Sequence, residues 1–294
     1  MDIGKLFNGI AVIVDNEIEN KTSAIYKIKE LIEAKNIPVA VYSQIPQLDV
    51  IPALSGASFI ILDWDYTNGE AEVGEDERVV IPDALTTSNE ERLIAFIKKI
   101  LSEIFVPVFI FTAKQTSTII DRLKEEKLWD NEKTNRIFVK QKTEVDSEEE
   151  LFSAITEWVK AMPSVYVLKE WDRVLSKTRN AMFNEFYTYS PNWAQIIWDM
   201  LKEDSIESQQ EFGNFVTRSL INRIQNYSFD EASIRSDTRP NTAELRKVVE
   251  GERYLSYAEQ PAQAYTGDLF KNGSKYYLNI RAQCSLAREG DPLL

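Results

Sequence analysis

The sequence predicts an α/β fold: a doubly wound, five-stranded parallel sheet, followed by a helical region and a small β-rich piece at the C-terminus. Short apolar runs rich in β-branched and aromatic residues recur through residues 1–162, as in strands that are buried on both faces of a sheet. Segments with apolar residues at helical spacing alternate with these runs, which is typical of parallel strands joined by helices. Beyond residue 162 the pattern becomes helical, and strand-like runs return only near the C-terminus.

The alternation places one helix after each of the five strands. After the first strand, for example, Ile25, Ile28 and Ile32 recur at helical spacing. The stripe that contains Leu93 and Ile97 marks a longer helix in the same way. The predicted strands are 11–14, 38–42, 59–62, 108–111 and 136–139, and the predicted helices are 23–34, 50–54, 90–105, 116–127 and 147–160.

Three regions follow from these patterns. Pro163 marks the end of the α/β domain, which we expect at residues 1–162. Residues 163–250 are predicted to be helical, and residues 251–294 are predicted to form the β-rich piece, because Asn272-Gly273 separates two strand-like runs as in a hairpin. Neither C-terminal region shows a catalytic cluster, so we expect them to bind a partner or to couple it to the α/β domain.

The composition excludes several classes of function. Histidine is absent, so Ser-His-Asp and Cys-His catalysis and His-rich zinc sites cannot be built. The single cysteine, Cys284, excludes an internal disulfide framework and indicates a reducing, cytoplasmic setting. A formal net charge of -13 without a dense basic stripe argues against nucleic-acid binding. We expect no membrane span, because the apolar runs fall short of about 20 residues. We also expect no signal peptide, because Asp2 and Lys5 are followed directly by a strand-like run.

Acidic residues follow the first and third predicted strands. Asp15, Asn16 and Glu17 come directly after the first strand, and Asp63 comes after the third. The carboxyl ends of parallel strands line the ligand crevice of an open α/β sheet, so we expect these side chains to lie close together. Magnesium takes one or two carboxylates and keeps several waters. The sequence therefore predicts a Mg²⁺ site built from these four residues, with Asp65 as a further candidate ligand.

Two more polar residues follow the remaining strands of the predicted crevice. Thr112 comes directly after the apolar run of the fourth strand, and Lys140 comes directly after that of the fifth. An aspartate can accept a phosphoryl group when a metal ion, a cation and a hydrogen-bond donor stabilise the phosphoryl oxygens. We therefore predict that Asp63 is the nucleophile, that Lys140 pairs with the phosphoryl oxygens, and that Thr112 donates a hydrogen bond to one of them.

Residues 8–160 resemble the receiver domain of two-component response regulators. The similarity lies in the segments 13–17, 61–63, 107–113 and 138–140, which match the acidic turn, the phosphoacceptor strand, the threonine strand and the lysine strand of that family in order. It implies a flavodoxin-like fold and a protein that receives a phosphoryl group from a histidine-kinase-like ATPase and signals by protein–protein contact. Its only enzymatic activity would be self-phosphorylation and self-dephosphorylation. A homodimer is compatible with this expectation, and bacterial systems of this kind include some associated with defence against phage.

The sequence departs from the receiver pattern at three positions. Asn16 stands where the family has a second acid, Gln141 stands where a proline commonly follows the lysine, and Ile137 occupies the aromatic position three residues before the lysine. An acidic insertion at residues 65–91, with nine acidic side chains and one arginine, also lengthens the interval between Asp63 and Thr112. These departures leave open a degenerate receiver that acts as a phosphorylation-independent docking module.

A haloacid-dehalogenase-like phosphatase is the third alternative. Residues 60–67 resemble the first motif of that family, in which Asp63 would be the nucleophile and Asp65 the general acid and base. That motif usually opens the fold, however, whereas here a strand that ends at Asp15 precedes it. No final acidic motif is evident after Lys140.

Overall fold

A computed structural model describes residues 3–64, 83–130, 135–203, 208–224, 227–235, 241–253 and 266–280. The chain divides into two compact units, Met1–Ser236 and Asp237–Leu294. The first unit contains the α/β domain and the helices that follow it, which we call the helical extension (residues 163–235). In the described residues, no helix is both long enough and apolar enough to cross a membrane.

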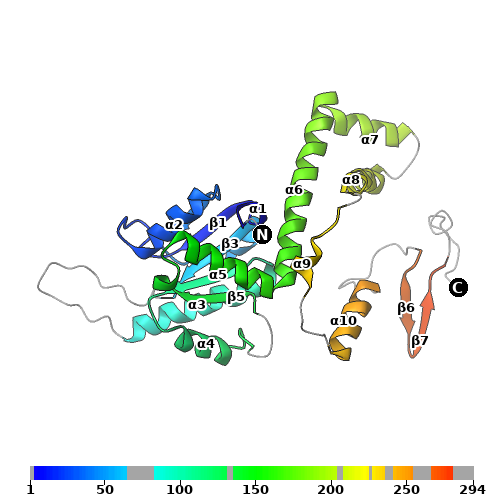
Figure 1. Cartoon of the computed structure of the whole chain (residues 1–294). Coiled ribbons are helices and arrows are strands. Elements are labelled where there is room, and N and C mark those ends of the chain that lie inside the picture. The colour runs from blue at the N-terminus through cyan, green and yellow to red at the C-terminus, as the bar shows by residue number, and fades with distance from the viewer. Residues whose placement is uncertain are drawn as a thin grey trace, which may run out of the picture. The chain divides into compact units, whose positions relative to one another are not determined.

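The α/β domain is built on one five-stranded sheet in which all strands are parallel (Figure 1). The strand order is β2-β1-β3-β4-β5, which is the order of flavodoxin-like doubly wound sheets. The predicted α/β class and five-stranded parallel sheet are therefore confirmed. The strands are β1 (Ile10–Val14), β2 (Val39–Tyr42), β3 (Ala57–Asp63), β4 (Val108–Thr112) and β5 (Ile137–Gln141).

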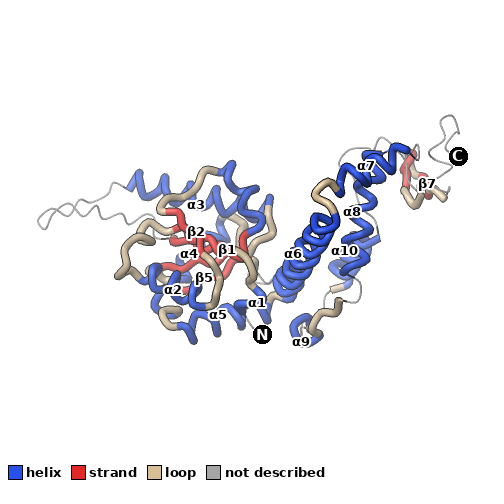
Figure 2. Tube along the Cα trace, turned by 90° about the horizontal axis from the view of Figure 1, so that it is seen from above, coloured by secondary structure: helices blue, strands red, loops and turns tan. Residues whose placement is uncertain are grey.

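Helices cover both faces of this sheet, as Figure 2 shows. Because side chains alternate along a strand, Ile61 and Phe109 pack into one core and Ile60 and Ile110 into the other. The first core is completed by α1 (Ile3–Leu6), α2 (Ala24–Ala34) and α5 (Glu148–Ala161), and the second by η1 (Leu48–Gly56), α3 (Asp83–Glu103) and α4 (Thr116–Glu125).

Two predicted helices differ from the structure. The predicted helix 50–54 is the 3-10 helix η1, which contains Pro52. The predicted helix 90–105 begins earlier, because α3 starts at Asp83, so the end of the acidic insertion lies on this helix. Residues 65–82 of the insertion lie outside the described residues.

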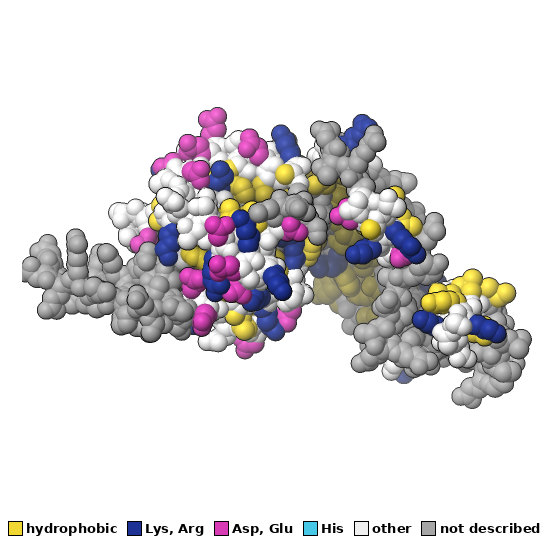
Figure 3. Space-filling model, turned by 90° about the horizontal axis from the view of Figure 1, so that it is seen from below, with side chains coloured by type: hydrophobic (Ala, Val, Ile, Leu, Met, Phe, Trp, Pro, Cys, Tyr) yellow, Lys and Arg dark blue, Asp and Glu magenta, His cyan; other side chains and the backbone are white. Residues whose placement is uncertain are grey.

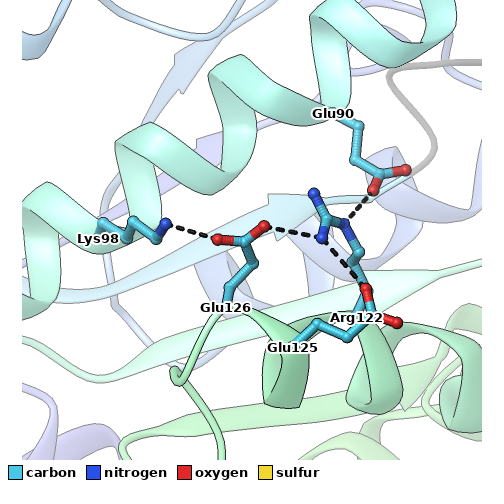
Figure 4. A network of polar contacts seen from close by, with 5 residues as sticks. All are labelled: Glu90, Lys98, Arg122, Glu125 and Glu126. Atoms are coloured by element: carbon cyan, nitrogen blue, oxygen red, sulfur yellow. Dashed lines mark hydrogen bonds and ion pairs between the residues drawn. The ribbon is translucent and has the colours of Figure 1, made fainter.

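The helices α3 and α4 are joined by a polar network on the surface (Figure 4). Arg122 of α4 contacts Glu90 of α3 at 2.7 Å and Glu126 at 2.7 Å, and Glu126 in turn contacts Lys98 of α3 at 2.6 Å. Exposed pairs of this kind contribute little individually, because water screens them. Among the described side chains of the α/β domain in Figure 3, acidic and basic groups are intermixed.

The two strands β3 and β4, near the centre of the sheet, are completely buried. All residues of β3 and β4 are buried, because both faces of these strands are covered by helices. At the edge of the sheet, β2 is only partly buried. The carboxyl ends of β3 and β4 are therefore held by packing on both sides, which fixes the positions of Asp63 and Thr112 at those ends.

The helical extension begins with a long helix that packs against the α/β domain. Its elements are α6 (Pro163–Tyr189), α7 (Trp193–Glu203), α8 (Ser208–Ile224) and α9 (Glu231–Ile234). Val165, Tyr166 and Lys169 at the start of α6 are buried. The Lys169 ammonium donates a hydrogen bond to the carbonyl oxygen of Ala57, the first residue of β3, at 3.1 Å. This contact joins the extension to the sheet.

Aromatic rings hold α6, α7 and α8 to one another. The ring of Phe186 lies 4.9 Å from that of Trp193 and 5.8 Å from that of Phe215, and Trp193 stacks on Phe212 at 6.0 Å. None of these rings is fully buried, and α7 buries no residue at all. The extension is thus held by a partly exposed aromatic cluster.

The second unit contains one helix, α10 (Thr242–Arg253), and a hairpin among its described residues. In the hairpin, β6 (Leu269–Asn272) pairs with the antiparallel strand β7 (Lys275–Leu278), so the predicted hairpin is confirmed. The turn contains Gly273 with φ 60°, a left-handed conformation that glycine adopts without steric cost.

Candidate phosphoryl-transfer site

Two buried carboxylates lie at the carboxyl edge of the sheet. Asp15 follows β1 directly and Asp63 is the last residue of β3, and these neighbouring strands are in register at Val14 and Leu62. Asp15 is 0% exposed and Asp63 is 2% exposed. Carboxylates are costly to bury unless cations or hydrogen bonds compensate their charge. Cations or hydrogen bonds must therefore compensate the two carboxylates at this edge.

Lys142 supplies such a cation. Its ammonium nitrogen Nζ lies 2.9 Å from Oδ2 of Asp15 and 3.2 Å from Oδ2 of Asp63. Lys142 itself is only 7% exposed and opens the short 3-10 helix η2 (Lys142–Glu144) after β5. Burial alone would lower the pKa of this ammonium, but the attraction of Asp63 and Asp15 outweighs burial and raises the pKa above its ordinary value. The ammonium is therefore charged wherever lysine normally is.

Lys140, the lysine that the sequence favoured, is placed elsewhere. Its ammonium lies 3.7 Å from Oε1 of Glu144 and its side chain is partly exposed. Lys140 lies within β5 beside Phe111, and a side chain inside a strand points to a face of the sheet. The strand continues through Lys140 to Gln141, so Lys142 is the lysine that follows the strand. The structure brings Lys142, not Lys140, to Asp63.

Thr112 lies at the end of the strand next to Asp63. It is 0% exposed, and Phe111, the residue before it, is in register with Asp63. Its hydroxyl oxygen accepts a hydrogen bond from the backbone nitrogen of Lys114 at 3.0 Å. This bond holds the side chain at the start of the loop between β4 and α4. The structure thus places β4, which ends at Thr112, directly beside β3, which ends at Asp63.

Gln141 links this loop to β5. Its backbone is in register with Thr112, and its side-chain nitrogen Nε2 donates to the carbonyl oxygen of Lys114 at 3.1 Å. Its backbone nitrogen donates to Oε2 of Glu144 at 3.0 Å, which fixes the start of η2. A proline could make neither of these two bonds, because it has no backbone N–H and no amide side chain. The residue that departs from the receiver pattern therefore positions the segment that carries Lys142.

The other predicted metal ligands are not gathered around the carboxylates. The side chains of Asn16 and Glu17 are exposed, although the backbone nitrogen of Glu17 donates to Oδ1 of Asp15 at 2.7 Å. Asp65 lies outside the described residues, so the second aspartate of the phosphatase alternative has no described position. Within the described part of the chain, no three His, Cys, Asp or Glu residues are grouped so that they could hold a metal ion.

The two buried carboxylates nevertheless fit part of a magnesium site. When both are ionised, Asp15, Asp63 and the ammonium of Lys142 leave one negative charge at the edge of the sheet. Magnesium binds one or two carboxylates and completes its shell with water, so Asp15 and Asp63 are sufficient as protein ligands. Asn16 and Glu17 would not be needed in the first coordination shell.

No protein-family model and no curated protein sequence matches this chain. The chemistry of the site is therefore inferred from its geometry. The arrangement offers two buried carboxylates, Asp63 and Asp15, a charged ammonium in contact with both, and the hydroxyl of Thr112 on the strand next to Asp63. Together with a bound metal ion, these protein groups would suffice for transfer of a phosphoryl group to an aspartate.

Proposed function

We propose that this chain is a response-regulator-like signalling protein that accepts a phosphoryl group on Asp63 from a histidine-kinase-like partner. The observation that carries this proposal is the contact of one buried ammonium, Lys142, with both Asp15 and Asp63 at the carboxyl edge of a flavodoxin-order sheet. The lone Cys284 and the acidic composition suit a cytoplasmic signalling protein.

The transfer step would use the groups that already meet at this edge of the sheet. A carboxylate oxygen of Asp63 attacks the phosphorus atom, a new O–P bond forms, and the bond from phosphorus to the donor breaks with its electron pair remaining on the donor. Magnesium held by Asp15 and Asp63 would neutralise the phosphoryl oxygens. Lys142 then transfers its ion pair from the Asp63 carboxylate to the phosphoryl group, and the Thr112 hydroxyl donates a hydrogen bond to it.

The helical extension is the part through which we propose that the signal reaches a partner. Its first helix contacts the start of β3 through Lys169, and β3 ends at Asp63. Its aromatic cluster is partly exposed, and exposed apolar surfaces of this kind commonly mark protein interfaces.

Intact-mass spectrometry after incubation with magnesium and acetyl phosphate tests the proposed function. The wild type and Lys140→Met should each gain one phosphoryl group, whereas Asp63→Asn should gain none. Lys142→Met should gain at least about tenfold less, because the phosphoryl oxygens lose a charge-assisted partner. Circular dichroism confirms that each variant is folded. An adduct that persists in Asp63→Asn, or that depends on Lys140 and not on Lys142, would contradict the assignment.

A phosphorylation-independent docking module is the second candidate. The described residues contain no group of three potential metal ligands, and the carboxylates are already paired with Lys142. A folded wild type that gains no phosphoryl group, and whose partner binding does not change in Asp63→Asn, would favour this module. Binding would then depend on the surface of the domain rather than on Asp63.

A further inference from the structure

The helical extension contains a pocket that the proposed phosphoryl-transfer site does not use. Its volume is about 380 Å³, and it lies between α6 and α8. One wall comes from one face of α6, and the rest comes from Arg223 near the end of α8 and from Tyr227 beyond that helix. The α6 residues that line the pocket are Arg173, Val174, Lys177, Thr178 and Ala181. Small-molecule sites typically have volumes of about 300–1,000 Å³, so the pocket is large enough for a small organic ligand.

Three basic side chains from two helices line this pocket in a chain whose net charge is -13. The guanidinium group of Arg173 lies 2.6 Å from Glu170, and that of Arg223 lies 3.0 Å from Glu185. These two carboxylates fix the two guanidinium groups. Lys177 differs, because its ammonium makes no hydrogen bond or ion pair within the described residues. The pocket therefore presents one uncompensated positive charge.

The remaining lining is suited to an apolar body. Val174 and Ala181 contribute aliphatic side chains from α6, and Tyr227 contributes its ring. The hydroxyl of Tyr227 donates to Oε2 of Glu170 at 2.5 Å. Burial and this contact with Glu170 both raise the pKa of Tyr227, so the phenol stays neutral near pH 7 and does not cancel the charge of Lys177.

We propose that this pocket binds a small organic anion, with an apolar or aromatic body and one phosphate or carboxylate group. The body would lie against Val174, Ala181 and the ring of Tyr227, and the anionic group would contact Lys177. Arg173 and Arg223 also line the pocket, but Glu170 and Glu185 already bind their guanidinium groups. The pocket therefore favours a ligand with one anionic group over a polyanion.

The pocket lies next to the turn of α6 that joins the helical extension to the sheet. Arg173 lies one helical turn beyond Lys169, which donates to Ala57 of β3, and the same stretch of α6 is tied to Tyr227 through Glu170. A ligand that contacts Arg173 and Tyr227 would therefore stabilise the turn of α6 that joins the helical extension to the sheet.

Isothermal titration calorimetry with the full chain and two matched probes tests this inference. The probes are 1-naphthyl phosphate and uncharged 1-naphthol, which share one aromatic body and differ in the anionic group. We expect 1-naphthyl phosphate to bind at least about tenfold more tightly than 1-naphthol. This factor corresponds to the free energy of one hydrogen bond between the phosphate and the ammonium of Lys177. Lys177→Glu should weaken binding of the phosphate ester by about tenfold or more.

Arg179→Glu provides the matched control. Arg179 lies two residues after Lys177 on α6 and does not line the pocket. Its substitution by glutamate changes the charge by the same amount as Lys177→Glu. Binding in this variant should equal that of the wild type, and circular dichroism should show that both variants are folded. Equal binding of the two probes, an equal loss in the two variants, or no binding of 1-naphthyl phosphate to the wild type would overturn the inference. Inorganic phosphate that binds as tightly as the ester would exclude a role for the apolar lining.

Discussion

Two buried lysines, one in the α/β domain and one at its junction with the helical extension, have different partners for the same positive charge. Lys142, at the edge of the sheet, contacts two buried carboxylates, whereas Lys169, at the junction, contacts a carbonyl oxygen and the half-exposed Asp172 at 3.4 Å. Burial lowers the pKa of Lys169, and the attraction of Asp172 only partly offsets it. The attraction of Asp63 and Asp15 instead raises the pKa of Lys142.

The contrast teaches that burial alone does not decide the charge of a lysine. Lys142 is 7% exposed and Lys169 is 4% exposed, yet their pKa values move in opposite directions. The number and burial of the neighbouring carboxylates decide the direction. The positive charge of Lys142 is therefore stabilised by two buried carboxylates, whereas that of Lys169 is only partly compensated by Asp172.

The largest expected effect comes from removing the cation at the edge of the sheet. Lys142→Met leaves Asp15 and Asp63 buried without their common partner, and loss of one member of a buried ion pair costs about 3–5 kcal/mol. Urea unfolding measures this change in the free energy of unfolding. Lys140→Met, whose partly exposed ion pair is 3.7 Å long, is the control and should change stability by less than about 1 kcal/mol. Equal losses in the two variants would contradict the assignment of Lys142.

A smaller effect is expected at the junction. Lys169→Met fills a similar volume but leaves the carbonyl oxygen of Ala57 without the hydrogen bond from the ammonium, which should cost about 1–3 kcal/mol. The loss is limited because the substitution also removes a charge that burial disfavours. Urea unfolding at pH 7 measures it, and Lys177→Met, on an exposed position of the same helix, serves as the control. A more stable Lys169→Met variant would show that desolvation of the ammonium outweighs its hydrogen bond.

The two lysines should also change the pH dependence of the free energy of unfolding in opposite directions. The pKa of Lys142 is raised on folding, so its contribution is complete below about pH 10.4 and is lost as pH rises above that value. The pKa of Lys169 is lowered on folding, so the wild type should gain stability relative to Lys169→Met as pH rises toward about 10.4.

Urea unfolding of the wild type and both variants between about pH 8 and 11 provides the measurement. Each lysine can contribute a slope of at most about 1.4 kcal/mol per pH unit, because a single proton is involved. The two wild-type-minus-variant curves should have slopes of opposite sign. Curves that slope in the same direction would show that one of the two charge environments is misassigned.

Most of the sheet and part of the site could be predicted from the sequence. The apolar runs mark strands buried on both faces, and Asp63 and Thr112 follow directly because they end two such strands. The lysine could not be resolved in the same way. Lys140 and Lys142 are two residues apart. The end of β5 at Gln141 decides that Lys142, and not Lys140, follows the strand and reaches the carboxylates.

The extension was less predictable because its contacts join residues that are distant in the sequence. Helical spacing predicts α6, α7 and α8 but not which aromatic rings meet. Lys169 was missed as a buried residue, although a signal was present. It continues the helical stripe formed by Met162, Val165 and Tyr166, all of which are buried.

The strand β3 is held by an ammonium group at each of its ends. Lys169 binds the carbonyl oxygen of Ala57 at the first residue, and Lys142 binds the carboxylate of Asp63 at the last. Sliding β3 by one residue against its neighbours would break both contacts and turn its buried side chains to the wrong face. The register of this strand is therefore locked, and its amide protons should exchange with solvent only when the whole domain unfolds.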